Sequence, residues 1–89
     1  MIEKEVLIVN RLGLHARAAA KFVTLASGFA SDVQLARNDR RVNGKSIMGV
    51  MMLAASQGTC LRLIVEGEDE QQASDELERL VAERFGEEE

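Results

Sequence analysis

The pattern of apolar positions along the chain switches between the two-residue period of a strand and the longer period of a helix. The apolar run at residues 6–9 is short and ends in a turn-like segment, which is typical of a buried strand. Further along, Leu61, Leu63 and Val65 alternate with the side chains between them. The pattern predicts four strands, at residues 5–10, 32–37, 40–43 and 59–66.

Helical spacing of apolar residues appears in the segments between these strands. Residues 16–27 place their apolar side chains on one face, and Gly28 follows as a C-terminal cap. A shorter helix is predicted over residues 47–53, where the hydroxyl of Ser46 can cap the first turn.

The last helix is predicted from residue 68 to Phe85. Its first turn is acidic, which suits the positive end of a helix dipole, and Gly86 ends it. Residues 87–89 contain no core-forming side chain and are expected to be a solvated tail.

The resulting order of elements is βαββαβα, with amphipathic helices that can cover only one face of a small sheet. It predicts an α+β fold, an open-faced β-sandwich in which three helices cover one face of a four-stranded antiparallel sheet. No proline, linker or repeat divides the chain, so residues 1–89 are expected to form a single domain.

Cysteine content and hydropathy indicate the compartment. Cys60 is the only cysteine, so no internal disulfide can form, and we expect its thiol to be packed as a small hydrophobic side chain. No apolar run approaches the roughly 20 residues of a membrane span, and the N-terminal residues lack the apolar stretch of a signal peptide. A cytoplasmic protein that does not enter a membrane is therefore expected.

Charge is distributed unevenly along the chain. Residues 1–65 hold nine basic and four acidic residues, a balance of +5, whereas residues 66–89 hold two basic and eleven acidic residues, a balance of -9. A basic body suits phosphate or an acidic partner, and the acidic end would repel nucleic acid. Three Phe without Tyr or Trp leave few rings for stacking on bases. Nucleic-acid binding is therefore not expected.

His15, the only histidine, lies immediately before the first predicted helix. The first N–H groups of a helix lack internal partners and the dipole is positive there, so an anion attached to His15 could be bound by backbone donors. The same field disfavours the imidazolium form, and a neutral ring keeps a lone pair that can attack phosphorus. Arg17 could neutralise charge on a transferring phosphoryl group.

Two interpretations of these residues remain open at this point. His15 and Arg17 can form a phosphoryl-transfer site, or His15 can be an N-terminal cap beside a solvated Arg17. His15 and Cys60 lie 45 positions apart in the chain, so they indicate neither a thiol site nor a metal site. No metal and no cofactor is expected.

Three segments together resemble one known family. Residues 13–17 (Gly-Leu-His-Ala-Arg) before an Ala-rich helix are similar to the active-site signature of HPr, the histidine phosphocarrier of the phosphoenolpyruvate-dependent sugar phosphotransferase system. Residues 45–51 resemble the regulatory serine segment of that family, and residues 57–70 resemble its final passage from strand to helix. The resemblance extends over nearly the whole chain.

The resemblance implies that enzyme I, charged from phosphoenolpyruvate, places a phosphoryl group on Nδ1 of His15, which passes it to an enzyme IIA domain. Arg17 would stabilise the charge of the phosphoryl group, and the backbone N–H groups of Ala16, Arg17 and Ala18 would bind it. The chain would then be a stoichiometric carrier rather than an enzyme. The family usually has proline where this chain has Ala18, and we expect transfer to persist with altered kinetics.

The resemblance also implies a regulatory role for Ser46, phosphorylated by HPr kinase/phosphorylase with ATP. A helix cap is the alternative interpretation of Ser46, and both roles can hold. Beside it, Ile47, Met48, Met51 and Met52 cannot all face the core of one short helix, so some should be exposed. The resemblance implies that Ile47, Met48 and Met51 dock enzyme I and enzyme IIA, and that the protein is a monomer. Four basic residues could complete a rim around this surface: Arg11, Lys21, Arg40 and Lys45.

Three other functions are compatible with the sequence pattern. A carrier of the same fold in the nitrogen-related branch would signal without moving sugar. A small α+β enzyme, such as an acyl-phosphate hydrolase, would turn over its substrate. An RNA-binding α+β module is the third, and the shortage of aromatic residues counts against it.

Overall fold

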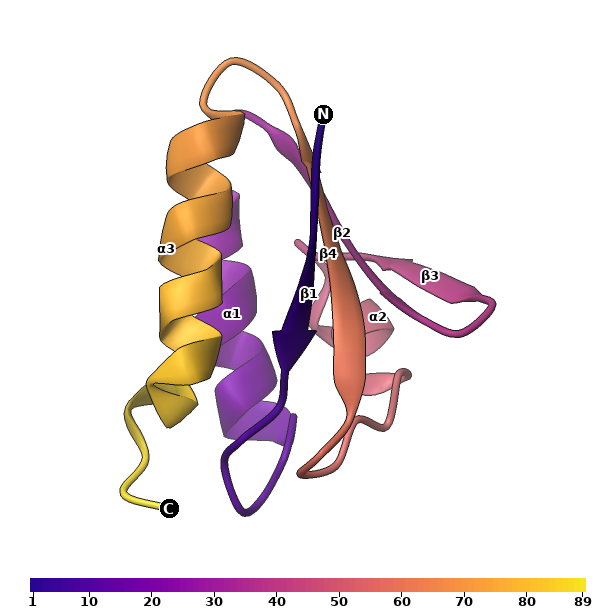
Figure 1. The fold of residues 1–89 in the computed structure, drawn as a ribbon, viewed down its shortest axis with the longest axis vertical. Coiled ribbons are helices and arrows are strands. Elements are labelled where there is room, and N and C mark those ends of the chain that lie inside the picture. The colour runs from indigo at the N-terminus through magenta and orange to yellow at the C-terminus, as the bar shows by residue number, and fades with distance from the viewer.

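The computed structural model describes residues 1–89, and its elements follow one another in the predicted order (Figure 1). Their bounds are β1 (Ile2–Leu7), α1 (Ala16–Ser27), β2 (Asp32–Arg37), β3 (Arg40–Asn43), α2 (Ile47–Met51), β4 (Cys60–Glu66) and α3 (Glu70–Ala82). A single 3₁₀ turn at Arg84–Gly86 follows α3.

The four strands form one antiparallel sheet in the order β1-β4-β2-β3. β4 lies between β1 and β2, and its residue Leu63 is opposite both Lys4 and Leu35. Figure 1 shows α1 and α3 side by side along the sheet, with the shorter α2 behind it. The predicted α+β open-faced architecture is confirmed.

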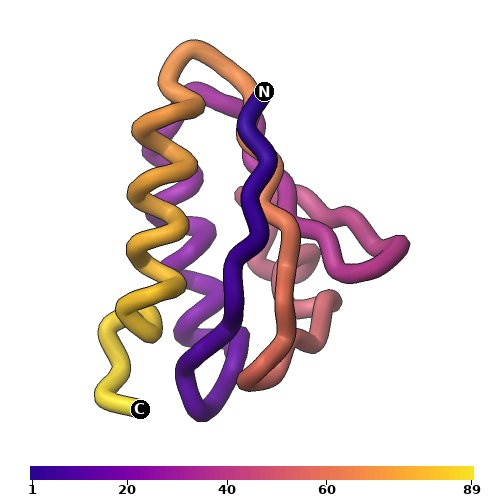
Figure 2. The backbone as a smooth tube through the Cα atoms, in the orientation of Figure 1, coloured from indigo at the N-terminus to yellow at the C-terminus, as the bar shows by residue number.

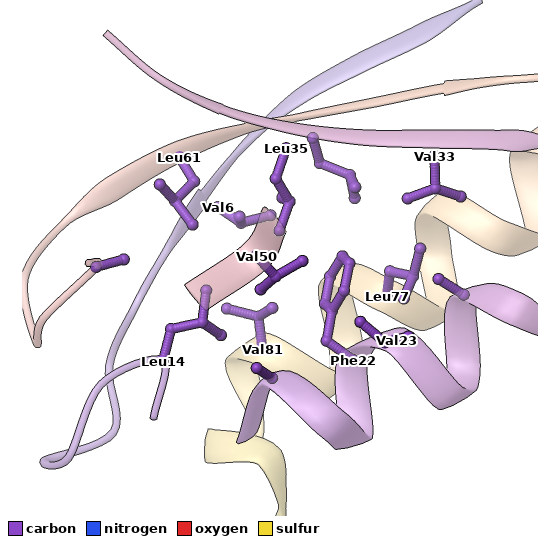
Figure 3. Packing of buried hydrophobic residues seen from close by; sticks show 14 of the residues in the cluster. Val6, Leu14, Phe22, Val23, Val33, Leu35, Val50, Leu61, Leu77 and Val81 are labelled. Atoms are coloured by element: carbon purple, nitrogen blue, oxygen red, sulfur yellow. The ribbon is translucent and has the colours of Figure 1, made fainter. Parts of the chain in front are cut away.

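The core fills the space between one face of the sheet and the helices. Val33 and Leu35 of β2 point toward Phe22 of α1, while Leu77 of α3 and Val50 of α2 reach the same space (Figure 3). The helices therefore cover one face only, as their amphipathic pattern predicted. None of the helices is long and apolar enough to cross a membrane.

The first strand differs from its prediction over residues 5–10. It begins at Ile2 and ends at Leu7, and the apolar run at 6–9 is not uniformly buried, because Leu7 is 47% exposed on the uncovered face of the sheet. Charged residues occupy the first part of β1, and they hid its period from the sequence pattern. The amine of Lys4 reaches over to α3, where it forms ion pairs with Asp75 at 2.9 Å and Glu78 at 3.1 Å.

The prediction that Cys60 is a packed hydrophobic side chain is wrong. Cys60 is exposed, and it lies opposite Leu7 in the register of β1 and β4. Because side chains alternate along a strand, burial of Leu61 against the helices turns Cys60 to the uncovered face.

The end of the chain also departs from the prediction. α3 ends at Ala82 instead of continuing to Phe85, although Phe85 is fully buried. Arg84 and Phe85 both have positive φ, 60° and 55°, so the chain leaves the helix direction there. In Figure 2 the C-terminal segment runs beside the loop that joins β1 to α1.

Candidate functional site

The loop between β1 and α1 presents His15 at one end of the molecule. The loop is closed by the backbone N–H of Gly13, which donates to the carbonyl of Asn10 at 3.1 Å. Gly13 has φ of 70°, and a Cβ there would lie 2.6 Å from the carbonyl oxygen of Ala55. The next N–H, of Leu14, donates to that same oxygen at 2.8 Å. A glycine is therefore needed at position 13 for the loop to approach Ala55 closely. The carbonyl of Ala55 then fixes Leu14, and Leu14 in turn fixes His15.

His15 is the N-terminal cap residue of α1 in backbone geometry, but its side chain does not cap. Its φ of -75° and ψ of 178° are extended, and the ring makes no hydrogen bond to the first turn. The first backbone bond of the helix runs from Ala19 N–H to the His15 carbonyl at 2.8 Å. The N–H groups before Ala19 are therefore free of helical acceptors, and the imidazole does not cap the helix.

A hollow of about 810 Å³ surrounds the ring. It is lined by the following residues: Arg11, Leu12, His15, Ala16, Arg17, Glu87, Glu88 and Glu89. The exposed guanidinium group of Arg17 makes no hydrogen bond or ion pair within the protein, and the His15 side chain is 28% exposed. The hollow therefore brings together His15, Ala16 and Arg17, as the sequence predicted.

Ala18 is placed differently from its neighbours. Its methyl group is fully buried in the core cluster, while Ala16 and Arg17 are exposed. Only its backbone N–H, in the first turn of α1, is available to act in the site.

The acidic tail lines the hollow around His15, and the partly buried Glu87 contradicts the prediction of a solvated tail, whereas Glu88 and Glu89 are exposed as expected. A carboxylate oxygen of Glu87 meets Nε2 of His15, and the other oxygen accepts a hydrogen bond from Asn10 Nδ2 at 3.0 Å. The Glu87 side chain is only 17% exposed. Farther along, the backbone N–H of Arg11 donates to the Glu89 carbonyl, and the Arg11 guanidinium pairs with the Glu89 carboxylate at 2.9 Å.

Two features of the sequence could have indicated this contact. The only histidine lies four positions after the basic Arg11, and the chain ends in three consecutive acids at residues 87–89. Opposite charges at two ends of a small chain favour proximity, but the reversal at Arg84 and Phe85 that brings them together has no local signal.

The electrostatics of Glu87 follow from these contacts. Donation from Asn10, and then from His15, lowers the pKa of the Glu87 carboxyl below its ordinary value, because both stabilise the ionised form. Glu87 is therefore a carboxylate at neutral pH.

Ser46 caps α2 as predicted. Its Oγ accepts a hydrogen bond from the Gly49 N–H at 3.1 Å, and the residue is half-buried. It does not line the hollow around His15. The structure thus separates the two candidate phosphorylation positions.

The apolar residues after Ser46 are largely exposed, as expected for a docking surface. Four of them, with Leu12 near His15, make up most of the large exposed apolar side chains: Ile47 is 44% exposed, Met48 76%, Met51 42%, Met52 59% and Leu12 68%. Leu12 was missed because a single apolar residue in a turn has no periodicity.

Of the four residues expected to form a basic rim, Arg11 lines the hollow around His15. Lys21 donates to the Phe85 carbonyl at 2.7 Å, Arg40 to that of Met52 at 2.8 Å and Lys45 to that of Phe29 at 2.8 Å. These two amines and one guanidinium group therefore each donate a hydrogen bond to a backbone carbonyl within the fold.

Comparison with known proteins shows that this fold and site are those of the phosphocarrier proteins. A relative in Cupriavidus necator, named phosphocarrier protein HPr, is 54% identical over 87 residues, which are 98% of each chain. Another of the same name, in Treponema pallidum, is 51% identical and covers 99% of this chain and 100% of its own. Residues 2–83 match the family described as PTS HPr component phosphorylation site. The chain belongs to this family, the HPr phosphocarriers of the phosphotransferase system.

Solved structures agree with the assignment. HPr from Thermoanaerobacter tengcongensis superposes with a TM-score of 0.96 at 46% identity, each chain covered completely. Crh, the catabolite repression protein of Bacillus subtilis, has a TM-score of 0.76 at 48% identity, with 94% of this chain and 97% of its own covered, and its structure is described as a swapped dimer. Family membership removes the support for a hydrolase or an RNA-binding module, and the names of the relatives do not favour the nitrogen-related branch.

Proposed function

We propose that this chain accepts a phosphoryl group from phospho-enzyme I on His15 and passes it to an enzyme IIA domain. The observation that carries the proposal is the state of His15: a partly exposed ring at the N-terminus of α1 that makes no capping bond. An anion bonded to this ring would meet the free N–H groups and the positive end of the helix dipole.

Arg17 is proposed to stabilise the charge of the transferring group. Its guanidinium is exposed at the hollow and has no partner within the fold, so no internal bond must break before it contacts phosphate. The backbone N–H groups of Ala16, Arg17 and Ala18 would supply further donors. These groups position and neutralise the phosphoryl group, which is most of what phosphoryl transfer requires of a protein.

Transfer in both directions makes the chain a stoichiometric carrier. A phosphorylated imidazole has a nitrogen leaving group, so His15 can give up the group it has accepted. Because enzyme I is charged from phosphoenolpyruvate, we place this cycle in the cytoplasm.

The exposed side chains of Ile47, Met48 and Met51 would dock enzyme I and enzyme IIA in turn, and we propose that the carrier acts as a monomer.

Ser46 is proposed as a regulatory phosphorylation site for HPr kinase/phosphorylase. Support comes from its hydroxyl, which lies at the start of α2 next to the exposed apolar side chains. A phosphate there would add about two negative charges to the docking surface, and so alter partner binding without contact with His15.

The test of the phosphocarrier function is incubation with enzyme I and phosphoenolpyruvate, followed by a count of phosphoryl groups by mass. One acid-labile group is expected on the natural chain and none on His15→Ala. Transfer onward is checked by adding enzyme IIA, which should discharge the carrier. Labelling of His15→Ala to the same extent would refute the proposal.

A further inference from the structure

The carboxylate of Glu87 touches the ring of His15, although the proposed phosphoryl transfer assigns it no role. One of its oxygens meets His15 Nε2 and the other accepts from Asn10. We propose that Glu87 is a positioning residue that holds the hydrogen of the neutral imidazole on Nε2, which leaves the lone pair on Nδ1 to attack phosphorus. This inference rests on the proposed function and names a further residue for it.

The two nitrogens of the neutral His15 ring differ in their chemistry. A neutral imidazole has one N–H donor and one nitrogen with a lone pair. An ionised carboxylate only accepts hydrogen bonds, so the nitrogen that faces Glu87 must bear the hydrogen. Nδ1 makes no hydrogen bond within the fold, and His15 does not use it to cap α1. The nucleophilic nitrogen is thereby defined by its partner on the opposite side of the ring.

Glu87 is held in place independently of His15. Lys21 of α1 donates to the Phe85 carbonyl at 2.7 Å, and the N–H of Arg11 donates to the Glu89 carbonyl. These bonds fix the backbone on both sides of Glu87. The carboxylate therefore keeps its position independently of the ring, and it can orient the ring by accepting from Nε2.

Asn10 makes the requirement for a carboxylate strict. Its fully buried amide donates from Nδ2 to the Gly13 carbonyl at 2.7 Å and to Glu87 at 3.0 Å. Both partners are acceptors, so the amide cannot be reversed without losing both bonds. Glu87 must consequently accept on one side from Asn10 and on the other side from His15, and only a carboxylate offers two acceptor oxygens.

A glutamine at position 87 would reverse the assignment. Its carbonyl oxygen would face Asn10, because the Asn10 amide presents a hydrogen there. Its NH₂ group would then face His15 and donate to Nε2, which moves the lone pair to Nε2 and the hydrogen to Nδ1. An alanine at position 87 would favour neither the Nε2–H nor the Nδ1–H tautomer. Glutamine should therefore be the more harmful replacement, although it is closer in shape to glutamate.

The transfer step balances with the hydrogen on Nε2. The Nδ1 lone pair forms the bond to phosphorus while the bond from phosphorus to the donor breaks, and its electron pair leaves with the donor. Nε2 keeps its hydrogen, so the ring becomes positively charged next to the Glu87 carboxylate. The other charged groups that line the hollow are Arg11, Arg17, Glu88 and Glu89. The positive charge of Lys21 on α1 also acts on the Glu87 carboxylate.

The experiment compares Glu87→Gln and Glu87→Ala with the natural chain. Nitrogen-15 NMR of the His15 ring at about pH 9, where histidine is ordinarily neutral, reports which nitrogen bears the hydrogen. The initial rate of phosphorylation by enzyme I reports function. We expect Nε2–H in the natural chain, a mixture in the alanine variant and Nδ1–H in the glutamine variant, with the glutamine variant slower than the alanine variant on the order of tenfold.

Glu83→Gln is the matched control. It removes the same charge from an exposed position near the end of α3 whose side chain makes no hydrogen bond or ion pair, so tautomer and rate should not change. Equal rates for the two Glu87 variants, or Nε2–H retained in Glu87→Gln, would overturn the inference. Faster phosphorylation of both variants would also overturn it, since the tail would then obstruct the ring. Failure of the proposed function is a separate result: a natural chain that takes up no phosphoryl group.

Discussion

Ser46 Oγ accepts a hydrogen bond from the backbone N–H of Gly49 at 3.1 Å, which closes the first turn of α2. The helix is only five residues long and contains a glycine, so it depends on its cap more than a longer helix would. The hydroxyl that would be phosphorylated is thus also a structural acceptor.

The first prediction separates these two roles of Ser46. Ser46→Ala should lower the free energy of unfolding by about 1 kcal/mol, the usual cost of a lost cap. Ser46→Asp keeps an acceptor at the same place and should stay near the natural stability, as measured by urea denaturation. An equal loss of unfolding free energy in both variants would show that an acceptor for the Gly49 N–H is not what stabilises the fold at this position. With a cognate kinase and ATP, phosphate should be found on the natural chain and on neither variant.

The second prediction concerns the proposed docking surface. Met48→Glu places a charge on a side chain that is 76% exposed beside Ser46, and should raise the KM of enzyme I for the carrier on the order of tenfold. Leu7→Glu makes the same kind of change at a side chain 47% exposed on the uncovered sheet face, and should leave KM unchanged. Similar KM values for both variants would place the docking surface elsewhere.

Much of the fold could be predicted from the sequence because its elements have complete local signals. α1 runs from Ala16 to Ser27 as predicted, since a continuous apolar face and Gly28 define both its body and its end. Ser46 was correctly identified as a cap because its neighbours continue with helical spacing. Such features depend on residues a few positions apart.

The parts that could not be predicted depend on contacts between distant residues. Cys60 and Leu7 are both exposed because they share the uncovered face of the sheet, and that face is known only once β1 and β4 are paired. The contact of Glu87 with His15 joins residues 72 positions apart through a chain reversal without a local signal. The sequence predicted His15 as the candidate reactive residue, but it did not predict its contact with Glu87.

The third prediction concerns pH and Asp69. The hydroxyl of Ser31 donates to Asp69 at 2.5 Å, and the N–H groups of Ala30 and Ser31 donate at 2.9 Å, which lowers the pKa of the Asp69 carboxyl below its ordinary value of 3.8. A lowered pKa in the folded state stabilises the fold above the ordinary pKa, and this contribution is lost as pH falls through the folded value.

Asp69→Asn should therefore be less stable than the natural chain at pH 7, and the two unfolding free energies should converge as the pH is lowered below 3.8. Urea denaturation across this range is the measurement. Glu68→Gln, at the exposed neighbouring residue, is the control and should show no such convergence. A difference between natural and Asp69→Asn chains that is constant with pH would mean that the ionised carboxylate is not the stabilising form.

The fourth prediction concerns Ala18, where the family usually has proline. The Ala18 N–H precedes the first bonded N–H of α1, that of Ala19, so proline would remove no helix bond and would fix φ near its helical value. Because the Ala18 side chain is fully buried, the larger ring must be accommodated in the core. These effects oppose one another, and we expect Ala18→Pro to change the unfolding free energy by no more than about 1 kcal/mol.

The kinetic effect should also be modest. Proline takes away one N–H near the phosphoryl group but makes the first turn more rigid, so the rate of phosphorylation from enzyme I should change by a few-fold and remain measurable in both chains. Ala20→Pro, inside the same helix, is the control and should destabilise the fold by about 3 kcal/mol, because proline breaks an interior turn. If Ala18→Pro instead raised phosphorylation from undetectable to rapid, the natural chain would be a carrier that has lost its activity, and the free N–H of Ala18 would not substitute for the rigidity of proline.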